Sequence, residues 1–135
     1  MLHQLVVGFQ MKKAKNTFLT VKKPWGHFTQ YTKEQKATVK IIQVNKGGIL
    51  SLQSHKNRDE LWVALDGGIT AQKGKAKKML KKGESIFIPK NTKHRLSSKQ
   101  GGQVLEISFG KFDESDIKRF EDKYGRAGKK AAEYK

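Results

Sequence analysis

The chain has 135 residues, no cysteine, and 29 lysines and arginines against 12 aspartates and glutamates, a formal net charge of +17. This length suits one domain with its own core, and the lack of cysteine excludes disulfides and thiolate metal sites. The charge attracts anions in general, but no nucleic-acid-binding motif accompanies it, so we expect no specific nucleic-acid partner. No apolar run could span a membrane and no secretory leader is recognisable, so a cytoplasmic protein is expected.

The sequence predicts three parts. Residues 1–21 are expected to form an N-terminal extension with an edge strand, residues 22–126 a folded domain, and residues 127–135 a basic tail. Within the domain, short alternating apolar runs are separated by turns rich in glycine and asparagine, a pattern typical of β-strands. So many short strands predict an all-β jelly-roll barrel. The expected strands cover residues 28–31, 38–44, 50–55, 60–65, 69–72, 76–80, 86–88 and 104–109.

Two neighbouring runs carry side chains suited to metal binding. Gln53 and His55 are two residues apart, so on a strand they project from the same face. Glu60 opens the next apolar run, and His94 follows a turn into a later strand. Amide, imidazole and carboxylate groups suit a borderline divalent ion. These four residues predict one metal ion, with zinc as the first choice and manganese, cobalt or nickel as alternatives.

The last expected strand adds a carboxylate. Glu106 shares a strand face with Val104 and Ser108. If this face points inward, the Glu106 carboxylate enters the pocket beside the metal.

One helix is expected near the C-terminus. Asp113 or Ser115 can cap such a helix at its start, and Gly125 can end it. Between them, Ile117, Phe120 and Tyr124 form an apolar stripe at three-to-four spacing. Such a helix would pack across the barrel or against a second subunit.

The spacing of the ligand candidates resembles the two-part cupin signature, which implies a double-stranded β-helix fold. The first part is matched by Gly47, Gln53, His55, Glu60 and Gly67, and the second by Gly83, Pro89, Asn91, His94 and Ser98. Gln53 stands where most cupins have a histidine. Asn91 replaces the usual glycine of a turn, and asparagine tolerates the left-handed conformation well.

A narrower resemblance covers residues 22–126. The segments similar to the C-terminal domain of type II phosphomannose isomerases are Lys23-Pro-Trp-Gly26, residues 50–62, residues 88–96 and residues 117–126. In that family the domain usually follows a mannose-1-phosphate guanylyltransferase domain, for which 135 residues leave no room, so a stand-alone domain is expected.

The resemblance implies a metal-dependent isomerase that interconverts mannose 6-phosphate and fructose 6-phosphate for GDP-mannose and polysaccharide biosynthesis. Moving a proton between C1 and C2 requires an electrophile, a base and a cation for the phosphate, and the metal would be the electrophile. Arg58, Lys93 and Arg95 are the phosphate-binding candidates. Arg58 comes first, because an arginine fork matches phosphate oxygens and the family associates this position with the active site. Glu106 is the candidate base.

Alternatives stay open. Arg58 could pair with Asp59 or another surface carboxylate, and Glu106 could hydrogen-bond the metal ligands. The whole protein could be a non-catalytic cupin that binds a sugar, a sugar phosphate or a metal, since a fold does not fix a function. Lys56 and Asn57, where the family is often rich in histidine, favour this alternative. In either case we expect a homodimer that forms through an open sheet edge.

Overall fold

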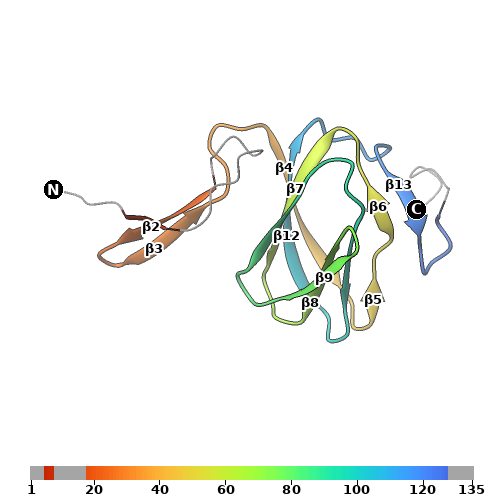
Figure 1. The fold of residues 1–135 in the computed structure, drawn as a ribbon. Helices are drawn as coiled ribbons and strands as arrows, with labels where there is room; N and C mark the ends of the chain where they lie inside the picture. The colour runs from red at the N-terminus through yellow and green to blue at the C-terminus, as the bar shows by residue number, and fades with distance from the viewer. Residues whose placement is uncertain (1–4, 8–17, 128–135) are drawn as a thin grey trace. The chain divides into compact units, whose positions relative to one another are not determined.

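The computed structural model describes residues 5–7 and 18–127, which fall into two compact units separated after Lys36 (Figure 1). The described residues form thirteen strands and no helix. Accordingly, this part of the chain has no helix that could cross a membrane. The prediction of an all-β protein is confirmed.

The N-terminal unit is a small antiparallel sheet in the order β1-β2-β3, made of Leu5–Val7, Leu19–Lys23 and Gly26–Gln30. Pro24 and Trp25 form the turn between β2 and β3, where Trp25 is exposed. Among the described residues of this unit, Val21 is the buried apolar side chain. The predicted boundary between residues 21 and 22 lies inside β2, and residues 128–135 of the predicted tail lie outside the described residues.

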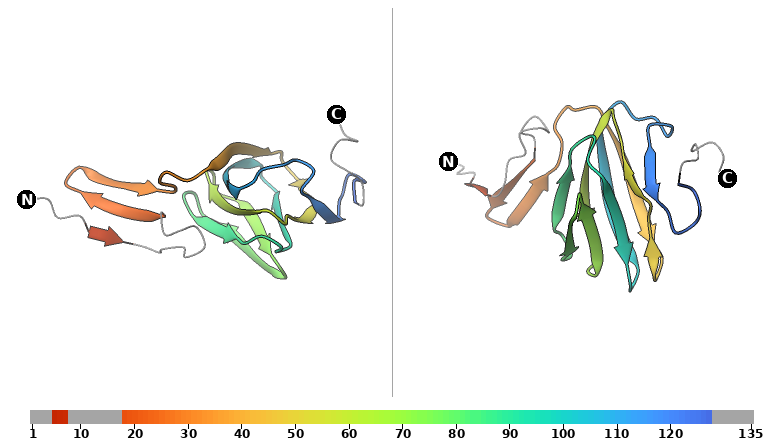
Figure 2. Two further views of the ribbon diagram at one scale, coloured as in Figure 1. Left: turned by 90° about the horizontal axis from the view of Figure 1, so that it is seen from above. Right: turned by 45° about the vertical axis from the view of Figure 1, so that its right-hand side comes forward.

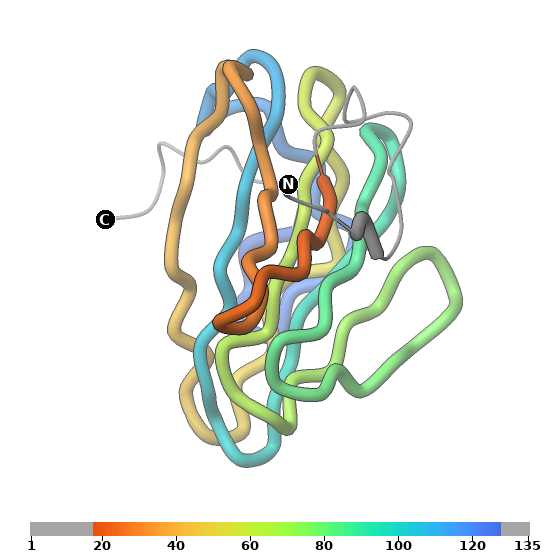
Figure 3. The backbone as a smooth tube through the Cα atoms, turned by 90° about the vertical axis from the view of Figure 1, so that its left-hand side faces the viewer, coloured from red at the N-terminus to blue at the C-terminus, as the bar shows by residue number. Residues whose placement is uncertain are grey.

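The larger unit is a barrel of two antiparallel sheets (Figures 1 and 2). One sheet has the order β10-β7-β12-β4, from Ser85–Ile88, Arg58–Ala64, Gly102–Gly110 and Ala37–Val44. The other has the order β13-β6-β11-β8-β9, from Lys118–Glu121, Leu52–Ser54, His94–Ser98, Ile69–Lys73 and Ala76–Leu80, and β5 (Gly48–Ile49) pairs with β11. Figure 3 shows the β8–β9 hairpin, in light green, standing out at the edge of this barrel.

The core of the barrel is formed by the inward residues of both sheets. Its buried members are Val44, Trp62, Ala64, Ile69, Ala71, Leu80, Ile88, Leu96 and Val104. Strand alternation places Glu60 on the same face of β7 as Trp62, and the register pairs Glu106 with Trp62 and Ser108 with Glu60. Because directly opposed residues share a sheet face, Glu106 points inward with Glu60, which settles the direction that the sequence left open.

The predicted C-terminal helix is wrong for the described residues. Lys118–Glu121 is strand β13, which pairs with β6 through Lys118 opposite Ser54 and Arg119 opposite Gln53. The Asp113 carboxylate accepts hydrogen bonds from the backbone and hydroxyl of Ser115 and so caps a turn. The free edge of β6 offers backbone partners along its length, and this tertiary pairing overrides the local helical spacing.

Candidate metal centre

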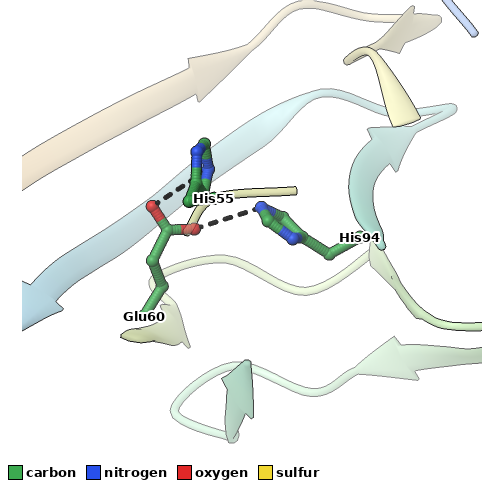
Figure 4. A group of neighbouring side chains, drawn as sticks. All are labelled: His55, Glu60 and His94. Atoms are coloured by element: carbon green, nitrogen blue, oxygen red, sulfur yellow. Dashed lines mark ion pairs between the residues drawn. The ribbon is translucent and has the colours of Figure 1, made fainter. Parts of the chain in front are cut away.

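Three of the predicted ligands meet between the two sheets. His55 follows β6, Glu60 lies in β7, and His94 is the first residue of β11, and all three side chains are buried. Figure 4 shows the two imidazoles pointing at opposite oxygens of one carboxylate. His94 Nε2 lies 3.2 Å from Glu60 Oε1, and His55 Nε2 lies 3.5 Å from Glu60 Oε2. One candidate ligand atom from each residue falls within 4.8 Å of the others, which is the spacing of a metal-binding cluster.

Backbone carbonyls fix the orientation of both imidazoles. His55 Nδ1 lies 2.7 Å from the Asp116 carbonyl oxygen, and His94 Nδ1 lies 2.8 Å from the Thr92 carbonyl oxygen. A carbonyl oxygen can only accept, so each Nδ1 carries the proton and donates it. Each Nε2 then directs its lone pair into the cluster, as in protein metal sites where the second imidazole nitrogen is tied to an acceptor.

Two buried atoms of the cluster lack a hydrogen bond within the described part of the chain, Glu60 Oε1 and His94 Nε2. They face each other, and with the proton of His94 on Nδ1 both are acceptors. A buried acceptor pair of this kind is costly unless a proton or a cation lies between the two atoms. Two imidazole nitrogens and a carboxylate oxygen are ligands that zinc and its neighbours accept, so the residues fit a divalent ion.

The Glu60 carboxylate is held from both sides. Its Oε2 accepts hydrogen bonds from Arg58 Nε at 3.1 Å and Ser108 Oγ at 3.4 Å, which leaves Oε1 for an ion. Burial raises the pKa of Glu60, but the neighbouring His94 and His55 rings and the hydrogen bond from Arg58 outweigh it and lower the pKa to about 2. Glu60 is therefore ionised, as a metal ligand must be.

Burial also acts on His55. It lowers the pKa of the His55 imidazole, and the opposing effect of the neighbouring Glu60 carboxylate is smaller. A neutral imidazole with a free lone pair is the form that binds metals.

Gln53 is placed beside this cluster by strand pairing. In β6 it lies directly opposite His94 of β11, and directly opposed residues share a sheet face. Its side chain is half-buried. The register therefore puts an amide on the His94 side of the centre, where the sequence predicted a fourth ligand.

Arg58 is buried in the centre and does not pair with Asp59. Besides the bond to Glu60, its Nη1 donates to the Asp113 carbonyl oxygen at 3.1 Å and its Nη2 lies 3.3 Å from His55 Nε2. The guanidinium carbon lies 4.5 Å from the centre of the Phe112 ring. These contacts hold the cation against the ligands, and only 6% of the residue is exposed.

The other two predicted phosphate ligands lie away from this centre. Arg95 follows His94 on β11, so it points to the opposite face of the sheet. There it donates to the Leu50 carbonyl oxygen and to the Glu121 carboxylate, which ties β13 to the barrel. Lys93 is exposed, and its Nζ lies 4.2 Å from the centre of the Phe120 ring.

A surface cavity of about 460 Å³ lies beside the turn that follows β6. Its lining residues are Ser54, Lys56, Asn91, Ser115, Asp116, Ile117, Lys118 and Phe120. Asn91 adopts the left-handed conformation, with φ of 65°, and its backbone N–H donates to the His55 carbonyl oxygen. Lys93 is not part of this lining, but its ammonium group lies over the ring of Phe120, which is.

Glu106 extends the buried polar group along the inward face. Its Oε2 accepts a hydrogen bond from Trp62 Nε1 at 3.0 Å, and the Trp62 ring lies edge-on to His94 with centroids 5.3 Å apart. Burial and, next, the negative charge of Glu60 raise the pKa of Glu106. Glu106 therefore holds a proton more readily than Glu60, and the two carboxylates lie on the same inward face.

Sequence reasoning missed the part played by the segment after β12. Asp116 supplies the carbonyl to His55, and its carboxylate accepts the backbone N–H groups of Lys56 and Asn57. Every residue has a carbonyl group, so the contact to His55 leaves no signature in the sequence. The Asp116 side chain, which can cap a turn, was the available signal.

The chain matches the family described as Mannose-6-phosphate isomerase C-terminal over residues 10–122. It is 37% identical over 109 residues to the xanthan biosynthesis protein XanB of Xanthomonas campestris pv. campestris, a match that covers 78% of this chain and 23% of XanB. It is 36% identical over 109 residues to mannose-1-phosphate guanylyltransferase ManC of Salmonella typhimurium, with 78% and 23% covered. The chain thus spans about a quarter of the length of these curated relatives.

The fold has solved counterparts at low sequence identity. An RmlC-like cupin from Shewanella frigidimarina superimposes with a TM-score of 0.53 and 13% identity, covering 82% of this chain and 87% of that protein. At this identity the likeness concerns the fold alone, and it supports the cupin barrel predicted from the signature. By the family match and the level of identity to its relatives, the chain belongs to the mannose-6-phosphate isomerase C-terminal family.

Proposed function

We propose that this protein is a cytoplasmic, metal-dependent aldose–ketose isomerase that interconverts mannose 6-phosphate and fructose 6-phosphate. The observation that carries the proposal is the facing pair of buried acceptors, Glu60 Oε1 and His94 Nε2, at a point that His55 Nε2 also approaches. The relative XanB is named for xanthan biosynthesis, which supports a place in polysaccharide precursor synthesis.

His55, Glu60 and His94, with Gln53 as a fourth ligand, would hold one divalent ion, zinc first and manganese, cobalt or nickel as alternatives. Such an ion supplies a positive charge that stabilises the enediolate oxygens formed during the reaction. The carbonyls of Asp116 and Thr92 keep the two imidazoles in the required tautomer. Arg58 and Ser108 keep Glu60 turned so that Oε1 is free.

Glu106 is proposed as the group that carries the proton between C1 and C2. Its carboxylate is buried on the same face as Glu60, and Trp62 fixes one of its oxygens. Burial raises the pKa of Glu106 and so brings its proton affinity closer to that of a sugar carbon acid. This suits general base catalysis. In this proposal the other oxygen of Glu106 would take up the proton.

The substrate phosphate needs a cation that substrate can reach. Lys93, beside the Phe120 ring at the cavity, is exposed and fits this role. Arg58 is buried against the ligands, so its contacts favour positioning of Glu60 and His55 over direct phosphate binding. The bonds of Arg95 to Glu121 and to the Leu50 carbonyl oxygen engage its guanidinium on the opposite sheet face.

One observation favours the second candidate, a cupin that binds a sugar, a sugar phosphate or a metal without turnover. The Arg58 guanidinium already contacts His55 Nε2 and Glu60 Oε2, so part of the cluster is neutralised by the protein itself. A pocket closed in this way could hold a ligand and perform no chemistry.

A coupled assay separates the two candidates. Purified protein is stripped of metal, supplied with zinc, manganese, cobalt or nickel one at a time, and given mannose 6-phosphate while fructose 6-phosphate is followed. The isomerase proposal expects turnover that a metal restores and that His94→Ala abolishes, with the exposed His27→Ala as the matched control. Stoichiometric metal binding without turnover for any of the four ions would favour the binding protein.

A homodimer would use the edge strand β4. Its outward Val39 and Ile41 are 58% and 60% exposed, which is unusual for β-branched apolar residues next to each other on one strand face. Packing against a second copy would cover them. Sedimentation equilibrium should show a dimer that Ile41→Lys converts to a monomer, and a wild-type monomer would contradict this arrangement.

A further inference from the structure

The β8–β9 hairpin is the most cationic segment of the barrel. From Ile69 to Lys82 the sequence is ITAQKGKAKKMLKK, which contains six lysines and neither aspartate nor glutamate. The lysines are Lys73, Lys75, Lys77, Lys78, Lys81 and Lys82. A surface segment with one sign of charge over this length attracts anions strongly.

The fold presents this segment to solvent. β9 is the last strand of its sheet, and all its residues except Leu80 are exposed. Among the described residues, the six ammonium groups have one ion pair, between Lys78 Nζ and Glu84 Oε2 at 3.1 Å. The other five charges of the hairpin are therefore available to a partner, and the hairpin stands out from the barrel edge (Figure 3).

An apolar side chain lies in the middle of these charges. Met79 is 66% exposed, and it shares the outward face of β9 with Lys77, opposite Thr70 and Gln72 of β8. Lysines on an edge strand can serve simply to prevent pairing with another sheet. That role does not account for Lys75, Lys81 and Lys82, which lie in the turns at the two ends of β9, or for an exposed methionine on the strand itself.

The composition of the hairpin indicates which anion it suits. Residues 69–82 contain no aromatic side chain on which a base could stack and no arginine for bidentate contact with phosphates or guanine. A membrane surface of anionic lipid requires neither. It is attracted by lysine ammonium groups in number, and it accommodates a flexible apolar side chain at the headgroup boundary.

We propose that the β8–β9 hairpin docks the protein on anionic lipid surfaces, with Lys75, Lys77 and Lys82 at the headgroups and Met79 inserted between them. The binding is peripheral and reversible, because one methionine supplies little apolar area. Its strength falls as salt screens the lysines. The proposal is independent of the isomerase activity, since the hairpin contributes none of the metal-centre residues.

Co-sedimentation of the full chain with vesicles tests the proposal. Vesicles of phosphatidylcholine alone are compared with vesicles that also contain phosphatidylglycerol, at low and at physiological salt. The hairpin variant replaces Lys75, Lys77 and Lys82 by glutamine. The matched control replaces Lys46, Lys111 and Lys123 by glutamine, which removes the same charge from exposed sites on other parts of the barrel. Circular dichroism verifies that both variants are folded.

We expect wild-type protein to bind only the vesicles with phosphatidylglycerol. Each lysine near an anionic surface contributes about fivefold, so the hairpin variant should partition on the order of 100-fold more weakly and the control variant much less so. Met79→Gln should weaken binding by a few-fold without altering its salt dependence. Equal losses in the hairpin and control variants would show that net charge alone attracts the lipid and would overturn the proposal.

Binding of a DNA duplex is measured in parallel, because DNA is the other polyanion that the lysines of the hairpin would attract. If the hairpin variant lost affinity for DNA while the affinities of both variants for vesicles stayed equal, a nucleic-acid surface would replace the lipid proposal. Failure of wild-type protein to bind phosphatidylglycerol vesicles at low salt would overturn it as well.

Discussion

Glu60 and Glu106 lie on the inward face of the same sheet, on adjacent strands, and both are buried, yet their pKa values move in opposite directions. Around Glu60, two imidazoles and a guanidinium outweigh the effect of burial. Around Glu106, the Trp62 N–H and the charges of Lys40 and Arg58 do not outweigh burial and the negative charge of Glu60. Environments that separate two carboxylates in this way often mark separate roles in one site. This agrees with the roles proposed above, a metal ligand for Glu60 and a proton carrier for Glu106.

Replacing Glu60 tests the ionised half of this comparison. Glu60→Gln removes the charge between the imidazoles and leaves the buried Arg58 without its anion. We expect loss of metal binding, a fall in turnover of about 1000-fold or more, and a free energy of unfolding of the metal-free protein lower by roughly 3–5 kcal/mol. Elemental analysis and urea denaturation measure these effects. Retention of stoichiometric metal would remove Glu60 from the ligand set.

Replacing Glu106 tests the other half and should give a different pattern. Glu106→Gln keeps an acceptor for Trp62 Nε1, so metal content should stay unchanged while kcat falls by about 100- to 10,000-fold. Loss of metal together with activity would instead make Glu106 a support for the ligands.

The same variant has a defined pH signature. The folded pKa of Glu106 lies above its unfolded value of 4.5. The stability that Glu106 contributes is thus fully present below pH 4.5 and is lost as the pH rises through the folded pKa. The free energy of unfolding of Glu106→Gln, relative to wild type, should therefore increase from acidic to neutral pH. A difference that does not change with pH would mean that Glu106 titrates normally in the folded protein.

The two arginines assigned to phosphate from sequence allow a further contrast. Arg58 is buried against Glu60, whereas Arg95 pairs with the exposed carboxylate of Glu121. Arg58→Met should lower the free energy of unfolding by about 3 kcal/mol, and Arg95→Met by less than about 1 kcal/mol. Arg95→Met should also leave KM unchanged, and a tenfold increase in KM would restore Arg95 as a phosphate ligand.

The cluster of His55, Glu60 and His94 was predictable because it depends on spacing. Gln53 and His55 are two residues apart at the end of β6, and Glu60 lies near the start of β7, so strand geometry predicts that they approach one another once the sheet is assumed. The same alternation places Arg95 on the face opposite His94, so its nearness to the ligands in sequence does not make it a neighbour of the cluster.

The prediction of a C-terminal helix was wrong for a physical reason. The spacing of Ile117, Phe120 and Tyr124 suits a helix, but the free edge of β6 supplies backbone partners for an extended chain. Contacts of this kind are made by backbone groups, which every residue carries, so local patterns cannot reveal them. The carbonyl of Asp116 that orients His55 escaped prediction in the same way.

The smallest expected effect concerns the edge of the site. Lys93 is exposed beside the ring of Phe120, which lines the cavity. A lysine that contacts substrate phosphate from solvent contributes to binding in the ground state and in the transition state alike. Lys93→Gln should therefore raise KM for mannose 6-phosphate by several-fold and leave kcat unchanged. Lys99→Gln, an exposed turn lysine, is the control for loss of one positive charge. Equal KM values for the two variants would assign the phosphate to another cation. Lys56 and Lys118, which line the cavity, would then be the next candidates.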